Sequence, residues 1–247
     1  MSALMMSGPT TGDGGSLVQR AIDAVRTHIR TEGLRVGDTL PGEGHFAVSL
    51  GVSRAVMREA FGVLAALRLI DVGNGRRPRV SAIDGAVMAS SLDHAVSTAQ
   101  ITVADVWDVR RTIEVRTAAL AAENRTDAEA RVLLDLAEAM ARDQDDMNAV
   151  AVHDIAFHET IAKAGRNALF VQIVTSFAPL MKEAVPAAWK TRSAPEERLA
   201  TLERHRALAR AIADRDVDAA VHAMDAHFDA SIGDILRGLS QRETLNV

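Results

Sequence analysis

Helical periodicity without a strand signal fills the chain after residue 85 and limits what this part can fold into. Apolar residues recur there at three- and four-residue spacing through alanine-rich stretches, which is the pattern of amphipathic helices. Seven helices in about 160 residues predict an all-α bundle, because each helix must bury its apolar stripe against another. The predicted helices span 86–99, 103–123, 127–144, 148–164, 168–190, 195–214 and 217–239.

Residues 16–82 have a different pattern. Apolar residues at every fourth position predict a helix over 17–31, and a second, short helix is predicted over 43–50 before a glycine. Ser53 can cap a third helix that runs to about residue 69. The next residues predict a small β-ribbon with a basic tip, because a Gly-Asn-Gly turn separates two short segments.

The third helix carries arginines on one side and apolar residues on the other. The spacing predicts an inward apolar stripe, while Arg54 and Arg58 lie one turn apart on the outer face of this helix. The stripe consists of Val56, Ala60, Val63, Leu64 and Leu67. With the short helix and the glycine turn before it, this helix forms a helix-turn-helix pattern. The second helix of that motif enters the major groove by its N-terminal end.

Charge divides the chain at the same place. The whole chain has 28 Lys and Arg against 33 Asp and Glu, a net charge of −5, which taken alone argues against a nucleic-acid partner. However, residues 16–82 hold ten Arg and six acidic residues, whereas residues 83–247 hold 18 basic and 26 acidic residues. We therefore predict a basic domain over 16–82 and an acidic domain over 83–247. Residues 1–15, rich in Gly, Ser and Thr, are predicted to be a flexible tail.

Several classes of protein are excluded by composition. The chain has no cysteine, so disulfides, thiolate metal sites and cysteine nucleophiles are excluded. No stretch approaches the roughly 18 consecutive apolar residues of a membrane span, and the first residues lack the pattern of a signal peptide. We therefore expect a soluble, cytoplasmic protein with no membrane partner.

Arginine is well suited to the predicted DNA-facing positions. Its planar guanidinium can donate two hydrogen bonds to the edge of a guanine or to a phosphate. Arg54 and Arg58 alone would be ordinary solvated residues, but the order of elements around them favours DNA binding. The ribbon tip from Asn74 to Arg77 would lie beside a groove, with Arg76 and Arg77 against phosphates.

Four polar residues lie on the apolar sides of three predicted helices. Asp154 and His158 are four residues apart, so they share one helix face, and His205 and His227 lie within apolar stripes. Burying any one of them without a partner costs about 2 kcal/mol or more, which favours their meeting. One carboxylate and three imidazoles can bind a divalent first-row metal. The alternative for each histidine is a hydrogen-bonded core residue.

Two stretches in the first domain, Gly37 to Glu43 and Leu50 to Ala60, resemble the winged helix-turn-helix domain of the GntR superfamily of bacterial transcription regulators. Gly44 departs from that pattern, because members usually carry a DNA-contacting arginine there, whose loss could cost about 1–3 kcal/mol of base discrimination. The resemblance implies DNA contacts near Gly75 and at Ser53, Arg54, Ala55, Val56 and Arg58.

The second domain resembles the FCD ligand-binding domain of the FadR-like subgroup. The stretch from Asp154 to His158, together with Asn167, His205 and His227, matches that domain. The resemblance implies that Asp154 and the three histidines bind a divalent metal, namely zinc, with nickel or manganese as alternatives. It also disfavours a fatty acyl-CoA effector, since the acyl-CoA-binding branch lacks the metal set.

The segment Val109 to Glu114 resembles the FCD helix whose arginine faces the effector pocket. By this resemblance Arg110, with Glu114 beside it, would hold the carboxylate of an effector. The alternative is a surface ion pair between Arg110 and Glu114, which are one helical turn apart. Asn167 either contacts the effector or caps the helix after it.

The function expected from these features is that of a homodimeric DNA-binding regulator, with repression as the expected mode and no enzymatic activity. Its partners would be operator DNA and a small carboxylate, such as a sugar acid, a hydroxy acid or a dicarboxylate. Two alternatives remain at the metal. One is a metal-dependent hydrolase, because a metal with an open position can activate water; the other is a purely structural metal.

Overall fold

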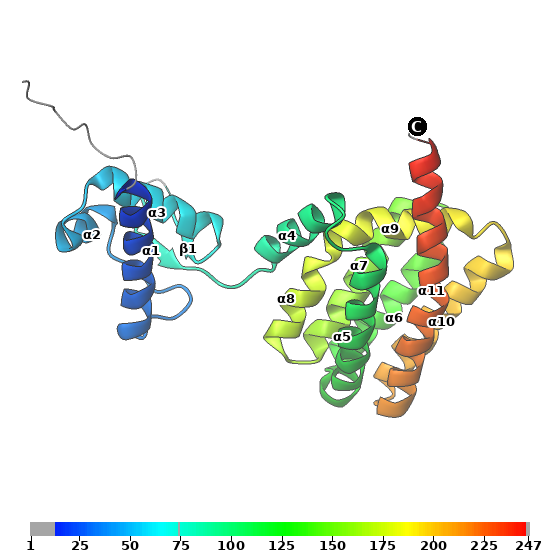
Figure 1. Ribbon diagram of the computed structural model, residues 1–247. Coiled ribbons are helices and arrows are strands. Elements are labelled where there is room, and N and C mark those ends of the chain that lie inside the picture. Colours follow the sequence, from blue (N-terminus) through cyan, green and yellow to red (C-terminus); the bar gives the residue numbers. More distant parts are fainter. Residues whose placement is uncertain (1–12, 74, 246–247) are drawn as a thin grey trace, which may run out of the picture. The chain divides into compact units, whose positions relative to one another are not determined.

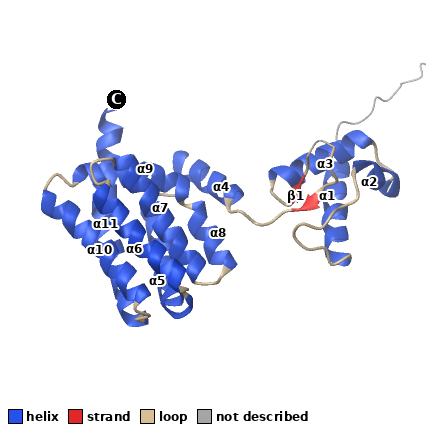
Figure 2. Ribbon diagram, turned by 180° about the vertical axis from the view of Figure 1, so that it is seen from behind, coloured by secondary structure: helices blue, strands red, loops and turns tan. Residues whose placement is uncertain are grey.

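The computed structural model describes residues 13–73 and 75–245, and the chain divides between Asp84 and Gly85 into two compact units. In its described residues the first unit has three helices and a two-stranded ribbon, and the second has helices alone (Figures 1 and 2). No single helix in the described part of the chain is long and apolar enough to cross a membrane. Only the bent pair α8 (Ala168–Ser176) and α9 (Ala178–Thr191), taken together, meets that test of length and composition.

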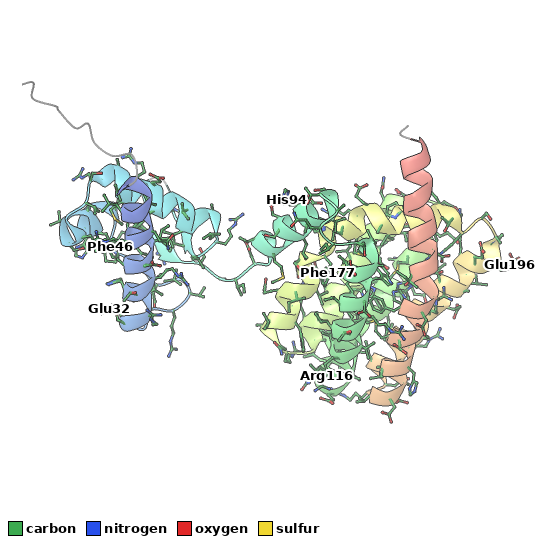
Figure 3. The ribbon with its side chains drawn as sticks, in the orientation of Figure 1. Glu32, Phe46, His94, Arg116, Phe177 and Glu196 are labelled. Carbon is green, nitrogen blue, oxygen red and sulfur yellow. The ribbon has the colours of Figure 1, made fainter. Side chains whose placement is uncertain are left out.

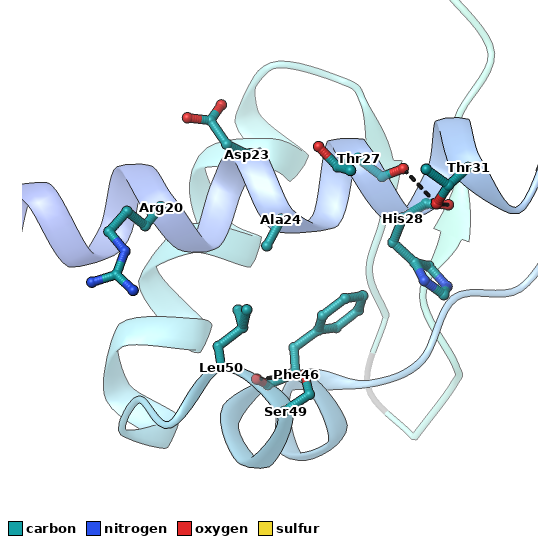
Figure 4. A pocket seen from close by; sticks show the side chains of 9 residues that line it. All are labelled: Arg20, Asp23, Ala24, Thr27, His28, Thr31, Phe46, Ser49 and Leu50. Carbon is teal, nitrogen blue, oxygen red and sulfur yellow. Dashed lines mark hydrogen bonds between the residues drawn. The ribbon is translucent and has the colours of Figure 1, made fainter.

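The first unit packs its helices around one apolar core. Its elements are α1 (Asp13–Thr31), α2 (Glu43–Leu50), α3 (Arg54–Ala66), β1 (Ile70–Asp71) and β2 (Arg79–Val80). The strands pair antiparallel, with Ile70 opposite Val80. Figure 4 shows the hollow between α1 and α2, where Phe46 and Leu50 of α2 point towards α1. The Phe46 ring lies edge-on to His28, with 5.4 Å between the ring centroids.

Two predictions for the first unit are wrong. Helix α1 begins at Asp13, so residues 13–15 are helical instead of part of a flexible tail; glycine disfavours a helix by only about 1 kcal/mol per residue. The predicted inward stripe of α3 is right at Ala60 and Leu64, which are buried, but wrong at Val63 and at Leu67 after the helix, which are exposed. Met57 and Phe61 are buried beside Ala60 and Leu64, so the core face of α3 is turned towards these two larger side chains. Residues 1–12 lie outside the described residues.

The second unit is the predicted all-α bundle. In it α5 packs against α7 and α11, and α9 packs against the same two helices from another direction. Thr102 and Thr126 begin α5 and α6 with capping boxes, in which each threonine side chain and the acid three residues later satisfy exposed backbone N–H groups. Besides α8 and α9, the helices are α4 (Ala86–Ser97), α5 (Val103–Asn124), α6 (Asp127–Arg142), α7 (Met147–Ala164), α10 (Pro195–Ala213) and α11 (Val217–Leu245).

The single helix predicted over 168–190 is wrong. The structure has two helices there, α8 and α9, which meet at Phe177 with a bend of 52° (Figure 3). Pro179 lies in the first turn of α9, where it has no N–H to donate to the carbonyl of Thr175 and its ring would clash with that carbonyl in a continuous helix. The bend lets α9 pack in the core against α7 and α11 while α8 packs against α4.

Candidate functional site

The four predicted metal ligands converge in the core of the second unit. Asp154 and His158 lie on α7, His205 on α10 and His227 on α11, and all four are at most 8% exposed. One nitrogen from each histidine lies within 4.8 Å of the others. Asp154 Oδ1 is 3.1 Å from His205 Nε2 and 4.0 Å from His158 Nε2. We call these four residues the histidine cluster.

Two ring nitrogens of the cluster lack hydrogen-bond partners, which indicates whether the cluster suits a metal. His158 Nε2 and His227 Nδ1 are buried and have no hydrogen-bond partner, although nearly all buried polar atoms in proteins have one. The other nitrogen of His158 is held by Glu114 Oε2, and the other nitrogen of His205 lies 2.9 Å from the Thr201 carbonyl oxygen. Metal-bound histidines are oriented in this way, by a carboxylate or a carbonyl on the second ring nitrogen. The cluster therefore fits a divalent metal ion.

The electrostatics of the cluster also suit a cation. Burial acts to raise the pKa of Asp154, but the hydrogen bond to His205 and the nearby histidines outweigh burial and hold that pKa well below its usual range. Burial lowers the pKa of His227, as do the other two histidines. Asp154 is therefore a carboxylate and His227 a neutral imidazole near neutral pH, which are the protonation states in which these groups bind metals.

Arg110 and Glu114 do form the pair expected from their spacing, but the surface location is wrong, since they are 3% and 1% exposed. Arg110 Nε donates to Glu114 Oε1 over 2.7 Å. Burial acts to raise the pKa of Glu114, and the charges of Arg110 and His158 outweigh it and lower that pKa. Both carboxylate oxygens of Glu114 are thus engaged. Glu114 contacts the ring nitrogen of His158 that faces away from the cluster. The prediction that Glu114 contacts an effector is therefore not supported.

A cavity of about 30 Å³ opens beside the cluster. The polar residues around it include Trp107, Arg110, Arg192, Asp154, His205 and His227. Sequence reasoning missed Trp107 and Arg192, because neither stands out without the tertiary structure. Arg192 ends α9, is 5% exposed and donates from Nε to Asp234 Oδ2 over 2.8 Å. The cavity thus has two buried guanidinium groups beside the histidine cluster, and a guanidinium group can hold a carboxylate through two parallel hydrogen bonds.

Asn167 lies elsewhere. Its side-chain oxygen accepts hydrogen bonds from the backbone N–H groups of Leu169 and Phe170, at 3.0 and 3.4 Å. It is the N-cap of α8, is exposed, and does not line the cavity beside the cluster. The structure therefore matches the capping alternative, and Asn167 is not part of our effector site.

The predicted DNA-contacting residues lie at the start of α3. Ser53 caps this helix by accepting a hydrogen bond from the Val56 backbone N–H over 3.2 Å. Arg54, Ala55 and Arg58 are exposed, whereas Val56 is half-buried and packs against the core. Arg58 Nε lies 3.8 Å from Glu43 Oε2. The exposed end of α3 therefore presents two arginines, of which one is partly neutralised.

The ribbon tip and Gly44 complete this surface. Gly75 has a left-handed backbone with φ of 71°, and Arg76 and Arg77 are exposed. Arg76 Nη2 lies 3.6 Å from Asp71 Oδ2. Asn74 lies outside the described residues. A Cβ added to Gly44 would lie 3.8 Å from the Arg54 guanidinium, so the position without the usual arginine adjoins Arg54.

Comparison with known protein families shows which family the chain belongs to. Residues 17–80 match the family of bacterial regulatory proteins called the gntR family, and residues 105–230 match the FCD domain. The chain belongs to the GntR family. The predicted fold class of a GntR-type winged helix-turn-helix followed by an all-α FCD bundle is confirmed.

Several GntR-family regulators are similar to the chain. The Glc operon transcriptional activator of Escherichia coli K12 is 33% identical over 157 residues, which cover 62% of this chain and only 62% of that protein. The transcriptional regulator LutR of Bacillus subtilis is 28% identical over 214 residues, covering 85% of this chain and 96% of that one. A GntR structure from Streptococcus agalactiae shares the fold, with a TM-score of 0.61, 23% identity, and coverage of 86% and 97%.

Proposed function

We propose that this GntR-family protein is a cytoplasmic, homodimeric transcription regulator, acting as a repressor, whose operator affinity is set by a small carboxylate bound beside a divalent metal. The metal would be zinc, with nickel or manganese as alternatives. The observation that carries the proposal is the pair of unpartnered nitrogens on His158 and His227, which lie beside Asp154 and a cavity that contains Arg110. Buried ring nitrogens that lack hydrogen-bond partners and lie beside a carboxylate can be satisfied by a bound cation.

Each half of the chain has a separate part in this function. Ser53 sets the start of α3, and Arg54 and Arg58 contact DNA there, while Arg76 and Arg77 contact phosphates from the ribbon. A dimer would place two such helices in half-sites about one turn of DNA apart. In the FCD domain, Asp154 and the three histidines hold the metal, and Arg110 pairs with the carboxylate of the effector. When bound, the metal would supply positive charge that attracts effector oxygens.

Regulation requires that the effector binds two dimer geometries with different affinity. An effector held by Arg110 on α5 and by residues of α7, α10 and α11 contacts four helices of the bundle at once. It shifts DNA affinity only by as much as it prefers one arrangement of those helices.

DNA binding is tested by selecting operators from a random pool with the full-length chain and measuring affinity by mobility shift. Arg54→Ala should abolish specific binding while leaving the fold and the dimer intact. Arg68→Ala is the matched control, because Arg68 follows the other end of the same helix, about 20 Å away. Sequence-specific binding that survives in Arg54→Ala would refute the proposed recognition helix.

The effector is tested on the selected operator with the zinc-loaded protein and a panel of small sugar acids, hydroxy acids and dicarboxylates. At least one acid should lower operator affinity, and Arg110→Lys should remove that response but retain DNA binding. Operator affinity that stays constant across the panel would contradict carboxylate control. Wild-type protein that carries no metal by elemental analysis would contradict the metal assignment.

Hydrolysis at the metal is the weaker candidate. A hydrolase needs a carboxylate or histidine next to the ligands that can take a proton from water. Among the described residues around the cluster, both carboxylate oxygens of Glu114 are engaged and Asp154 is bonded to His205. Hydrolytic turnover by the full chain that is lost in His158→Ala would favour the enzyme instead.

A further inference from the structure

Trp107 has a buried polar atom that neither DNA binding nor metal binding uses. Its indole Nε1 is buried and has no hydrogen-bond partner, and the residue lines the cavity beside the histidine cluster. The other tryptophan, Trp189, donates from Nε1 to the Gln144 carbonyl oxygen over 2.9 Å. The two buried indoles therefore differ in one respect, since only that of Trp189 is satisfied by the protein.

Only one kind of partner suits this atom. An indole N–H donates one hydrogen bond, accepts none and cannot bind a metal. Nearly all buried donors are satisfied by protein, water or ligand. The Asp154 carboxylate lines the same cavity, yet Trp107 Nε1 has no partner in the protein. The acceptor for Trp107 is therefore a water molecule or a ligand that enters the cavity.

Packing holds the indole beside the arginine of the effector site. Arg110 Cζ lies 4.7 Å from the centre of the Trp107 ring. The Phe228 ring also packs against Trp107, with 5.5 Å between the ring centroids. A ligand whose carboxylate contacts Arg110 would therefore have its neighbouring atoms within reach of Trp107. In a small acid, the acceptor nearest the carboxylate is an oxygen on the next carbon.

From this placement we propose that Trp107 determines effector specificity: its indole N–H donates a hydrogen bond to a hydroxyl or keto oxygen adjacent to the effector's carboxylate. This inference rests on the proposed carboxylate effector and narrows it to 2-hydroxy and 2-keto acids. A site built to hydrogen-bond a substituent rejects the analogue that lacks it, because the buried group is then left unpaired.

The test compares pairs of acids that differ by one hydroxyl. Calorimetry with the zinc-loaded, full-length protein measures the Kd of acetate and glycolate, propanoate and 2-hydroxypropanoate, and butanedioate and 2-hydroxybutanedioate. For at least one pair, the wild type should bind the hydroxy acid about tenfold more tightly or better. Trp107→Phe should reduce that ratio to about one with little change for the plain acid, since phenylalanine keeps the ring but has no N–H.

Two controls separate a hydrogen bond from a structural role. Trp189→Phe removes the other indole N–H, outside the cavity, and should leave the ratio unchanged. In the NMR spectrum of protein labelled with ¹⁵N, the Trp107 indole proton should move downfield with the hydroxy acid and not with the plain acid. Zinc content and circular dichroism of Trp107→Phe should match those of the wild type; if they do not, the indole proton shift in the wild type decides.

The outcomes distinguish this inference from the function on which it rests. If acids bind but the ratio is the same in Trp107→Phe and in the wild type, the indole is satisfied by water and the inference is wrong. A wild type that prefers the plain acids also overturns it, while carboxylate control stands. If none of the six acids binds, the small-carboxylate effector falls and the inference falls with it.

Discussion

Glu114 and His158 are joined by a hydrogen bond between Oε2 and Nδ1, which connects helices α5 and α7 in the core of the FCD domain. The other oxygen of Glu114 accepts from Arg110. One carboxylate therefore orients both a proposed metal ligand and the arginine proposed to hold the effector. The proposed metal and effector sites are thus connected through a residue that belongs to neither of them.

Replacing Glu114 should weaken metal binding without removing a ligand. In Glu114→Gln the imidazole of His158 loses its charged partner, and we expect zinc affinity to fall about 10- to 100-fold. Competition with a fluorescent chelator measures this change. Glu123→Gln, an exposed acid on the same helix, is the control. A zinc affinity equal to that of the wild type would show that Glu114 does not orient His158.

Metal removal should destabilise the FCD domain. A ligand present at 100 times its Kd stabilises the folded state by about 2.7 kcal/mol, which corresponds to roughly 5–10 °C in the Tm of a domain of this size. Calorimetric scans with zinc and with a chelator measure the difference. His227→Ala should abolish it, whereas His222→Ala, on the exposed side of the same helix, should retain it. An equal Tm with and without zinc would be the contrary result.

Acid should weaken the connection between α6 and the turn after α7. Arg166 Nη1 donates to Glu129 Oε1 over 2.7 Å, and this bond, with the N-cap contacts to Thr126, lowers the pKa of Glu129 to about 2. Because the folded-state pKa is depressed, the stabilisation is present above the ordinary pKa of 4.5 and is lost as pH falls towards 2.

The matching variant is Glu129→Gln, which lacks the charge at any pH. Urea unfolding should show it less stable than the wild type by the order of 1 kcal/mol near neutral pH, because the pair is partly exposed. The difference in free energy of unfolding between the two proteins should become smaller as the pH falls below about 4.5. A gap that is independent of pH would contradict the assignment.

Gly85 should not tolerate a side chain. Its backbone has φ of 65°, and an added Cβ would lie 2.8 Å from the Gln172 carbonyl oxygen on α8. Gly85→Ala should therefore destabilise the packing of α4 on α8 by about 1–3 kcal/mol, measured by hydrogen exchange of α4. Gly62→Ala, in α3 with nothing within 4 Å, should instead stabilise its unit by about 0.4–1 kcal/mol. Equal effects of the two variants would contradict this.

Gly44→Arg should restore a DNA contact. The new side chain would begin 3.8 Å from the Arg54 guanidinium, at the proposed DNA surface. We expect tighter operator binding at low salt and a salt dependence steeper by about one ion. Gly44→Ala controls for the backbone change. A salt dependence equal to that of Gly44→Ala would place this position away from DNA.

The sequence allowed much of the fold and the histidine cluster to be predicted, because both depend on local spacing. Asp154 and His158 share a helix face by their four-residue separation, and each of the other histidines lies within an apolar stripe. Helix ends were predictable where side chains cap them, as at Thr126. The end of α3 could not be predicted in this way. Arg68 has a left-handed backbone with φ of 56°, a conformation that residues other than glycine rarely adopt.

The rest of the site depends on which helices meet. Glu114 could not be assigned to His158 from sequence, because 44 residues separate them. Arg192 follows a predicted helix close to a break, where charged residues are normally exposed. Trp107 was one apolar residue among many on its helix. The break at Pro179 is different, since a proline inside a predicted helix is itself a signal that the helix ends or bends there.

The lining of the cavity bears on how sensitive the proposed regulator would be to its effector. Ala188 and Val185 line the cavity beside its polar residues. If the effector binds one arrangement of the bundle, its apparent Kd rises as the population of that arrangement falls. The packing of Ala188 and Val185 would therefore set the metabolite concentration at which the regulator responds, without touching the chemistry that recognises it.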